Sequence, residues 1–432
     1  MNIAFVTLLL GLLSGPQEVR LSVGGGVAAV ELRLDGAFAA RAVAPPWAAF
    51  VDFGPEILPR DLEAIAFDSE EHEVGRARIR VNMPRPRAGA SFVVERPDQT
   101  GRQMARLAWE STVAATPRTI RITLDEELLD VEDPSRFEIP PGEPGQTRIL
   151  RADLRFGNNI SAVAEAFLGS HDRDYTSAEL TAVAVLLTGR KELPPPERLS
   201  GWFVADDRPL RVVVTEEGPA DVVFLVDPAA EKRLLEIVRV GHWKPIFGTD
   251  RKRQNFRLEK DHLVTFILPA PERTEGTPYN VFPAAGPFSR SDGGLLWLYF
   301  NSQAYRPMAP EAAAFRRAAP LTGTAAITNG RRRAAVWILS SLPPADLSDL
   351  EPARRYLQVL NVPLFIWRVS PDGRPSSGSG GDLDASTPDA LDSAISHLEM
   401  ALNRQRIVWV EGNPLPQKIV LTPRATGIDL AR

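Results

Sequence analysis

Residues 221–227 read Asp-Val-Val-Phe-Leu-Val-Asp, a continuous apolar run that ends in an aspartate. A strand that is buried on both faces of a parallel sheet has this pattern, because neither of its faces alternates with solvent. Helix signals follow at once, since Asp227 suits an N-cap, Pro228 suits the first turn, and apolar residues at helical spacing continue to Val238. The stretch therefore predicts the first strand and helix of an α/β domain.

The same alternation continues towards the carboxyl terminus. The chain offers three further apolar strands and two amphipathic helices, in the order Leu263–Leu268, Ala334–Leu339, Asp349–Leu360, Pro363–Trp367 and Ala390–Gln405. Strands that alternate with helices are typical of a doubly wound, Rossmann-like α/β fold.

The preceding half of the chain has a different pattern. From Glu18 to Pro86 it reads as short strands with turns between them, as in Val30–Leu34, where charged and apolar residues alternate before the turn pair Asp35-Gly36. From Ala90 to Lys191 this pattern repeats on a larger scale. We expect two all-β, Ig-like sandwiches ahead of the α/β domain.

The amino terminus carries an apolar run from Ile3 to Leu13. It is too short to span a bilayer of about 30 Å as a helix and fits the apolar region of a signal peptide, although no Lys or Arg precedes it and no A-x-A site follows. The alternative is a buried N-terminal strand. We expect export, which places the protein outside the cell, in the periplasm or on the cell surface. Since no other run reaches roughly 18 apolar residues, we expect no transmembrane segment in the mature chain.

Composition excludes several classes of function. The chain of 432 residues has no cysteine, which rules out disulfides, thiolate metal sites and a cysteine nucleophile. Its net charge of −5 gives no global field that would recruit nucleic acid, so we expect no nucleic-acid partner. No H-E-x-x-H, G-x-S-x-G or P-loop motif is present, and we therefore expect a protein that is not an enzyme.

The carboxyl half resembles a von Willebrand factor type A (VWFA) domain. The resemblance rests on the strand that ends at Asp227, the run Arg332–Leu339, the strand Pro363–Trp367 and the closing helix. The segments Pro45–Gly54 and Glu73–Ala77 are similar to the Ig-like region that precedes this domain in some secreted bacterial proteins.

The resemblance implies a Mg²⁺ site at the carboxyl ends of the strands, built from three loops. Where the family has D-x-S-x-S, this chain has Asp227 followed by Ala229 and Glu231 in place of the two serines. The threonine of the second loop matches either Gly293-Gly294-Leu295, which lacks it, or Gly323-Thr324-Ala325, which keeps it. The aspartate of the third loop is missing from Ser340-Ser341-Leu342.

Magnesium requires near-octahedral oxygen ligands, and one carboxylate with one threonine does not supply them. We therefore expect Asp227 to cap the helix, no cofactor to be bound, and Asp227 and Thr324 to be remnants of a lost metal site.

The resemblance divides the chain into six parts. These are a signal peptide (1–17), an Ig-like domain (18–88), a second Ig-like domain (89–192), a proline-rich linker (193–210), a VWFA-like domain (211–412) and a carboxyl-terminal strand or tail (413–432).

Other polar clusters have simpler interpretations. We expect His171–Asp174 to form a hairpin loop and Asp382–Ser386 to be a solvated linker. The basic clusters Arg251–Arg253 and Arg331–Arg333 suit wet faces, either of which can meet an acidic partner.

Three functions compete. The first is an exported, non-catalytic scaffold that binds a protein partner through side chains such as Trp243, Tyr279 and Phe282. The second is a Mg²⁺-dependent adhesion domain with a rearranged ligand set of Asp227, Thr324 and either Asp346 or Asp349. The third is an exported hydrolase whose carboxylates lie close in space although distant in sequence.

Overall fold

The structure is a computed structural model. It describes residues 3–5, 7, 9, 12–84, 88–94, 102–111, 116–125, 127–141, 148–156, 161–168, 180–227, 229–230, 233–234, 236–237, 263–268, 280–283, 312–328, 330–340, 347–370, 372–374 and 382–432. The chain divides into two compact units, of which one joins Met1–Pro84 to Leu180–Arg432 and the other is Arg85–Glu179.

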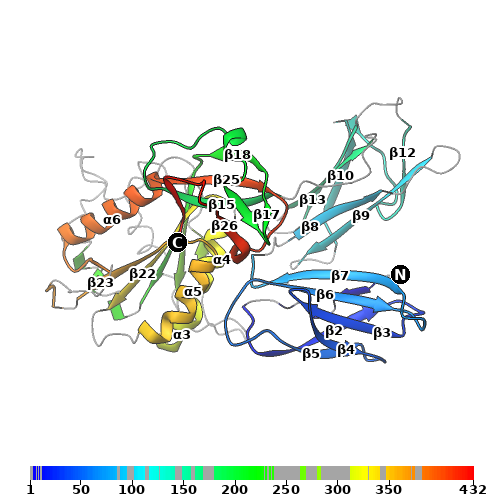
Figure 1. The fold of residues 1–432 in the computed structure, drawn as a ribbon, viewed down its shortest axis with the longest axis horizontal. Coiled ribbons are helices and arrows are strands. Elements are labelled where there is room, and N and C mark those ends of the chain that lie inside the picture. The colour runs from blue at the N-terminus through cyan, green and yellow to red at the C-terminus, as the bar shows by residue number, and fades with distance from the viewer. Residues whose placement is uncertain are drawn as a thin grey trace. The chain divides into compact units, whose positions relative to one another are not determined.

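The first unit begins with a β-sandwich of seven strands. They are β1 (Ile3–Phe5), β2 (Pro16–Val23), β3 (Ala29–Leu34), β4 (Ala37–Ala42), β5 (Ala48–Asp52), β6 (Arg60–Phe67) and β7 (Glu73–Val81). One sheet has the order β1-β2-β5 and the other β4-β3-β6-β7, and their inner faces share one apolar core (Figure 1). The predicted turn at Asp35-Gly36 is confirmed, since both residues have the positive φ that a tight hairpin requires.

The second unit is also a sandwich of seven strands. They are β8 (Ala88–Val94), β9 (Gln103–Ser111), β10 (Thr119–Leu124), β11 (Glu127–Leu128), β12 (Phe137–Ile139), β13 (Arg148–Arg155) and β14 (Ser161–Leu168). Its sheets have the orders β12-β9-β8 and β11-β10-β13-β14. Counted from the start of each domain, both sandwiches pair strands 1-2-5 in one sheet and 4-3-6-7 in the other. The prediction of two Ig-like β-domains is confirmed at this level.

The α/β part of the first unit contains a six-stranded sheet. Its strands, in spatial order, are β21 (Asn280–Pro283), β20 (Leu263–Leu268), β19 (Ala220–Val226), β22 (Arg332–Ser340), β23 (Leu364–Val369) and β24 (Leu383–Asp384). Five strands are parallel, and the edge strand β21 is antiparallel. When the six strands are numbered in chain order, their spatial order across the sheet is 3-2-1-4-5-6, which is typical of doubly wound sheets.

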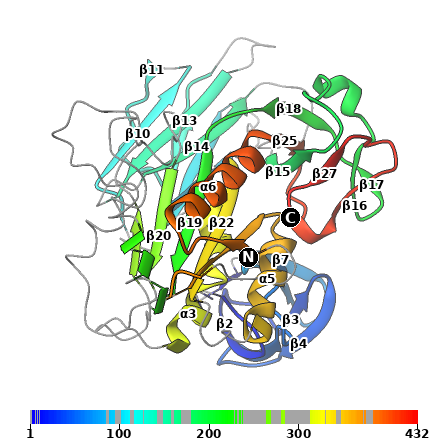
Figure 2. The same ribbon diagram turned by 90° about the vertical axis from the view of Figure 1, so that its left-hand side faces the viewer.

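Both faces of this sheet are covered. Every residue of β19 is buried, with Val222 and Phe224 packing in one core and Val223 and Leu225 in another. The first core includes helix α6 (Pro388–Asn403), which lies along one face of the sheet (Figure 2). The second core includes α3 (Ala312–Ala318), α4 (Leu321–Ile327) and α5 (Glu351–Val359). Burial on both faces explains why β19 reads as a continuous apolar run.

A third β-region is built from segments on either side of the α/β part. Its strands are β15 (Leu180–Leu187), β16 (Phe203–Ala205), β17 (Arg208–Pro209), β18 (Val212–Glu216), β25 (Gln405–Glu411), β26 (Ile419–Leu421) and β27 (Ile428–Leu430). They form two sheets, β18-β25-β15-β27 and β17-β16-β26, around a common core.

This β-region corrects the predicted boundaries. The second sandwich ends at Glu179 and not at residue 192, because β15 pairs along its length with β25. The proline-rich segment 193–210 is not a linker, since Leu199 and Phe203 are fully buried in the core of this region. The α/β domain starts after residue 211 and ends before residue 412, because β18 and β25 pair with each other in the third β-region. Residues 413–432 contribute β26 and β27 to the same region.

The predicted signal peptide also has a place in the fold. Strand β1 pairs with β2, and Leu9 lies in the core of the first sandwich with 7% of its surface exposed. This is the buried-strand alternative, and export stays a prediction. None of the helices in the described ranges has the length and apolar character needed to cross a bilayer.

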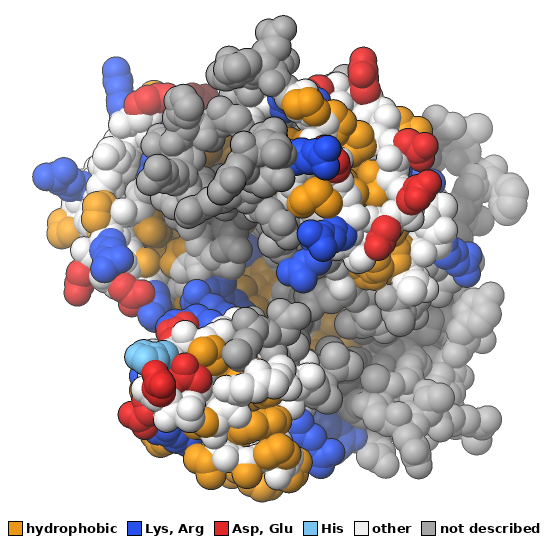
Figure 3. All heavy atoms as spheres, turned by 90° about the vertical axis from the view of Figure 1, so that its right-hand side faces the viewer, with side chains coloured by type: hydrophobic (Ala, Val, Ile, Leu, Met, Phe, Trp, Pro, Cys, Tyr) orange, Lys and Arg blue, Asp and Glu red, His pale blue; other side chains and the backbone are white. Residues whose placement is uncertain are grey.

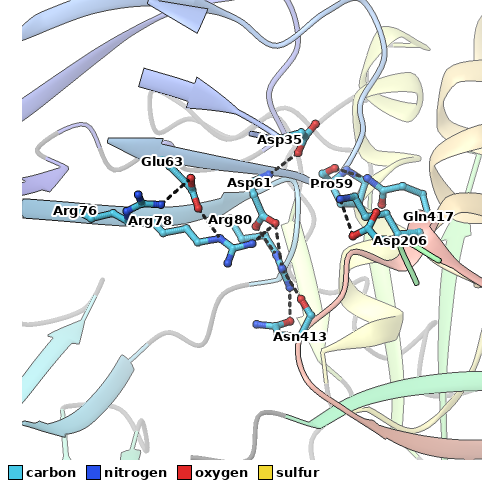
Figure 4. A network of polar contacts seen from close by, with 11 residues as sticks. Asp35, Pro59, Asp61, Glu63, Arg76, Arg78, Arg80, Asp206, Asn413 and Gln417 are labelled. Carbon is cyan, nitrogen blue, oxygen red and sulfur yellow. Dashed lines mark hydrogen bonds and ion pairs between the residues drawn. The ribbon is translucent and has the colours of Figure 1, made fainter. Parts of the chain in front are cut away.

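The first sandwich is joined to the rest of its unit by specific polar contacts (Figure 4). Arg80 of β7 donates to the carbonyl of Asn413 at 2.7 Å, and Gln417 donates to the carbonyl of Pro59 at 2.6 Å. The buried hydroxyl of Tyr356, in α5, donates to the carbonyl of Asn82 at 2.7 Å. These bonds link segments that lie some 270 to 360 positions apart.

Candidate functional site

The carboxyl edge of the parallel sheet is the expected place for a site in an open α/β fold. At this edge β19 is followed by Asp227, β22 ends at Ser340, β23 is followed by Ser370, and β24 leads to Ser386. These four residues therefore bring carboxylate and hydroxyl oxygens to one end of the sheet.

Asp227 is held by main-chain groups. Its Oδ1 accepts a hydrogen bond from the amide of Ala229 at 3.0 Å, and its Oδ2 accepts one from the amide of Ser340 at 3.3 Å. The first bond is that of a helix N-cap, since residues 229 and 230 are helical. The second ties the end of β19 to the end of β22. Both carboxylate oxygens thus have a structural role.

The oxygens beyond β23 and β24 are bonded to one another. The Ser386 hydroxyl donates to Asp384 at 2.6 Å and accepts from the Ser370 amide at 2.8 Å, and the Ser370 hydroxyl donates to Asp372. The hydrogen bond from Ser370 is the main cause that lowers the pKa of Asp372. These groups satisfy each other and are not arranged around a common ligand position.

The segment Asp382–Ser386 is not a solvated linker, contrary to the prediction. Asp382 forms a buried ion pair with Arg368 at 2.8 Å, and each side chain is 8% exposed. Leu383–Asp384 is strand β24, and Ser386 is fully buried. The sequence alone does not reveal this, because the strand has two residues and its partner Arg368 lies in a separate apolar run.

The other predicted ligands that the structure describes have partners of their own. Thr324 belongs to α4, where its hydroxyl donates to the carbonyl of Leu321 at 3.0 Å. Gly323 is also in α4, where an added Cβ would lie 2.9 Å from Leu360, so this glycine serves helix packing. Asp349 pairs with Arg316 at 2.7 Å. Gly293, Gly294 and Asp346 lie outside the described residues.

The donor set therefore does not fit magnesium. Within the described ranges, no group of three or more His, Asp or Glu residues is placed to hold a metal ion. A Mg²⁺ ion needs about six oxygens, and Ala229, where the family has a serine, offers no side-chain oxygen beside Asp227.

The basic cluster Arg331–Arg333 does not form a solvent-exposed surface. Arg332 and Arg333 are buried, and Arg333 donates to the carbonyl of Ala182 at 3.0 Å while its amide donates to Gln405 at 2.9 Å. Burial lowers the pKa of Arg333 to about 10, against the attraction of Asp221. The two arginines are buried because β22 begins where the α/β sheet meets β15 and β25. Arg251–Arg253 lie outside the described residues, as does His171–Asp174.

The predicted aromatic anchors are mostly outside the described part of the chain. Trp243 and Tyr279 are not described, and Phe282 lies in strand β21 opposite Phe266, not in a loop. The described residues instead expose large apolar side chains on the first sandwich, with Phe38 65% and Phe50 70% exposed. Figure 3 shows hydrophobic side chains interspersed with charged ones on this domain.

Comparisons with known proteins leave the family open. No protein-family model and no curated protein matches the chain. Among solved structures, fibronectin(III)-like modules of Clostridium thermocellum CbhA match 40% of this chain and all of theirs, at 12% identity and a TM-score of 0.16. The central fibronectin-III array of RIM-binding protein matches 47% of this chain and 81% of its own, at 10% identity and a TM-score of 0.26.

A third match is SGBP-B of Bacteroides ovatus, solved in complex with a mixed-linkage heptasaccharide. It covers 49% of this chain and 57% of its own, at 9% identity and a TM-score of 0.14. Similarities of this extent carry no argument about the present chain, and the assignment of its sandwiches rests on the strand orders given above.

Proposed function

We propose that this protein is a non-catalytic scaffold that binds another protein, with Ig-like sandwiches accompanying a VWFA-like α/β domain. The strand order 3-2-1-4-5-6, with helices on both faces, supports the VWFA-like assignment. One observation carries the mode of binding: Asp227 caps the helix through the amide of residue 229, and this residue is an alanine, without the side-chain oxygen of the family's serine. Adhesion through a bridging ion would need about five further oxygens, and we therefore place the contact on side-chain surface.

The exposed apolar residues of the first sandwich are suited to such contact. Phe38 in β4 and Phe50 in β5 lie on neighbouring edge strands, and Val43, just beyond β4, is 69% exposed. Large exposed apolar side chains that lie close together are typical of protein-binding surfaces. Export, to the periplasm, the cell surface or the medium, is part of this proposal and depends on how the amino terminus is processed.

The two alternatives have less support. A rebuilt Mg²⁺ site needs Thr324 and Asp349, which have other partners. A hydrolase with a carboxylic general acid needs a carboxyl group of raised pKa, whereas the pKa is lowered at seven described carboxyl groups, among them Asp61 and Asp153.

Partner capture in the presence and absence of a chelator tests the proposal. The immobilised full chain should capture the same partner, identified by mass spectrometry and then purified, equally in Mg²⁺ and in EDTA. The variant Phe38→Ser/Phe50→Ser should reduce capture at least fivefold, while Met400→Ser, which changes an exposed apolar residue of α6, should not. Loss of capture in EDTA would favour metal-dependent adhesion, and turnover of a substrate without capture would favour the hydrolase.

A further inference from the structure

The outer face of sheet β11-β10-β13-β14, in the second sandwich, is rich in arginine. Strand β13 alternates strictly, with Leu150, Ala152 and Leu154 fully buried and with Arg151, Asp153 and Arg155 on the outer face. On β10, Arg121 lies directly opposite Asp153 in the register. We call the exposed residues Arg121, Arg151 and Arg155 the arginine face.

This face already binds one carboxylate. Arg151 holds Asp153 in a fork, with its Nε 3.1 Å from one oxygen and its Nη2 2.9 Å from the other. The hydrogen bond from Arg151 is the main cause that lowers the pKa of Asp153, and the charges of Arg121 and Arg155 lower it further, while burial opposes them. A single carboxylate therefore lies in the field of three guanidinium groups.

The positive charge of the face exceeds what Asp153 can neutralise. Within the described ranges, Arg121 and Arg155 form no ion pair. Two exposed guanidinium groups, one on β10 and one on β13, are thus available to anionic groups from outside.

Apolar side chains lie on the same face. Ile149 precedes Arg151 by two positions and is 42% exposed, and Leu128 of β11, opposite Thr123, is 69% exposed. A surface that offers both guanidinium groups and aliphatic side chains suits a polypeptide that carries acidic and apolar residues. A nucleic acid is less suited, because the whole chain has a net charge of −5 and gives no global field that would recruit it.

We propose that the arginine face is a docking surface for an acidic segment of a protein partner, with Arg121 and Arg155 each receiving a carboxylate in the way that Arg151 receives Asp153. The planar fork of arginine matches the geometry of a carboxylate and is more selective for it than a lysine ammonium would be. This inference rests on the proposed protein-binding function and names one of its surfaces.

A fluorescent twelve-residue peptide with the repeat Glu-Leu-Asp tests the proposal. Its binding to the full chain is measured by fluorescence anisotropy at low salt. The double variant Arg121→Glu/Arg155→Glu should weaken binding at least tenfold, and added salt should weaken binding to the wild-type chain. The matched control is Arg102→Glu/Arg136→Glu, which makes the same change of charge at two exposed positions at the start of β9 and before β12. This control should retain binding within twofold.

Three outcomes would overturn the inference. In the first, both double variants weaken peptide binding equally. In the second, a wild-type chain whose circular dichroism shows it to be folded does not bind the peptide. In the third, a single-stranded oligonucleotide displaces the peptide more strongly than the unlabelled peptide does, and this displacement depends on the same arginines. If the partner captured in the EDTA experiment binds the Arg121→Glu/Arg155→Glu variant normally, this surface is wrong while the proposed function stands.

Discussion

Asp227 shows how one side chain can be predicted as either a cap or a ligand from the same sequence. Its two oxygens stabilise the start of a helix and the end of β22. We expect Asp227→Ala to lower the free energy of unfolding by about 1–2 kcal/mol, the usual cost of losing an N-cap, and Asp227→Asn to lower it less. Urea denaturation of the two variants measures this, and an unchanged midpoint in Asp227→Ala would contradict the capping role.

Asp61 makes the stability of the first sandwich depend on pH. Burial acts to raise its pKa, but hydrogen bonds and charges from Arg80 and Arg78 outweigh burial and hold the pKa below its ordinary value (Figure 4). A carboxylate with a lowered folded-state pKa adds stability above its unfolded-state pKa, near 4, and that stability is lost as the pH falls through the folded-state value.

The expected result is a wild-type midpoint of unfolding that falls as the pH is lowered from 6 towards 2, with a smaller fall in Asp61→Asn. The control is Asp52→Asn. It changes a carboxylate of β5 that accepts a hydrogen bond from the nearby amide of Gly54. Identical pH profiles for wild type and Asp61→Asn would exclude the contribution of Asp61.

At the scale of elements, the turn after β7 joins three segments through Asn82. Its side chain accepts from the amide of Leu13 and donates to the carbonyls of Leu13 and Leu58, and its own carbonyl accepts from Tyr356. Asn82 also has a φ of 56°, a region that asparagine tolerates better than most residues. The segment that leads into β2 is thereby fixed to the same point as α5.

We expect Asn82→Gly to cost about 2–3 kcal/mol, because it keeps the backbone conformation and loses three side-chain hydrogen bonds. Asn82→Ala should cost about 1 kcal/mol more, since its Cβ disfavours a positive φ. Guanidinium denaturation gives both values, and a smaller loss in the alanine variant than in the glycine variant would contradict the role given to the positive φ, and a negligible loss in both would contradict the role of the hydrogen bonds.

A helix or strand could be predicted from the sequence where its burial leaves a regular pattern of apolar residues. The apolar runs of β19 and β22 and the helix Pro388–Asn403 follow from local sequence, because burial on both faces or on one helical stripe leaves a direct signature. The third β-region was not predictable, because Leu199 and Phe203 meet their partner Ile419 only after more than 200 residues. For the same reason Arg332 and Arg333 looked like a solvated cluster.

At the scale of the molecule, the second sandwich has a core of its own, formed by residues such as Leu107, Leu150 and Leu154. We therefore expect residues 85–179 to fold when expressed alone. Dispersed amide signals in a proton–nitrogen correlation spectrum and a cooperative thermal transition would confirm this. A spectrum typical of an unfolded chain would show that this unit depends on the rest of the protein.

The site was predictable in part. The capping role of Asp227 was predicted from Pro228 and the helical spacing that follows, and the hydrogen bond from the Ala229 amide confirms the cap, while the loss of the ion site stays a prediction. The mutual hydrogen bonds of Ser370, Asp372, Asp384 and Ser386 could not be predicted, because they join two strand ends that the sequence separates by a loop. The arginine face likewise depends on the register of β10 against β13.

Calorimetric titration of Mg²⁺ and Mn²⁺ into the full chain, pretreated with a chelator and dialysed, tests the central claim most directly. Because Asp227 caps a helix and Ala229 offers no side-chain oxygen beside it, we expect no heat above that of dilution up to millimolar metal. Saturable heat with micromolar affinity, lost in a folded Asp227→Asn variant, would contradict the account.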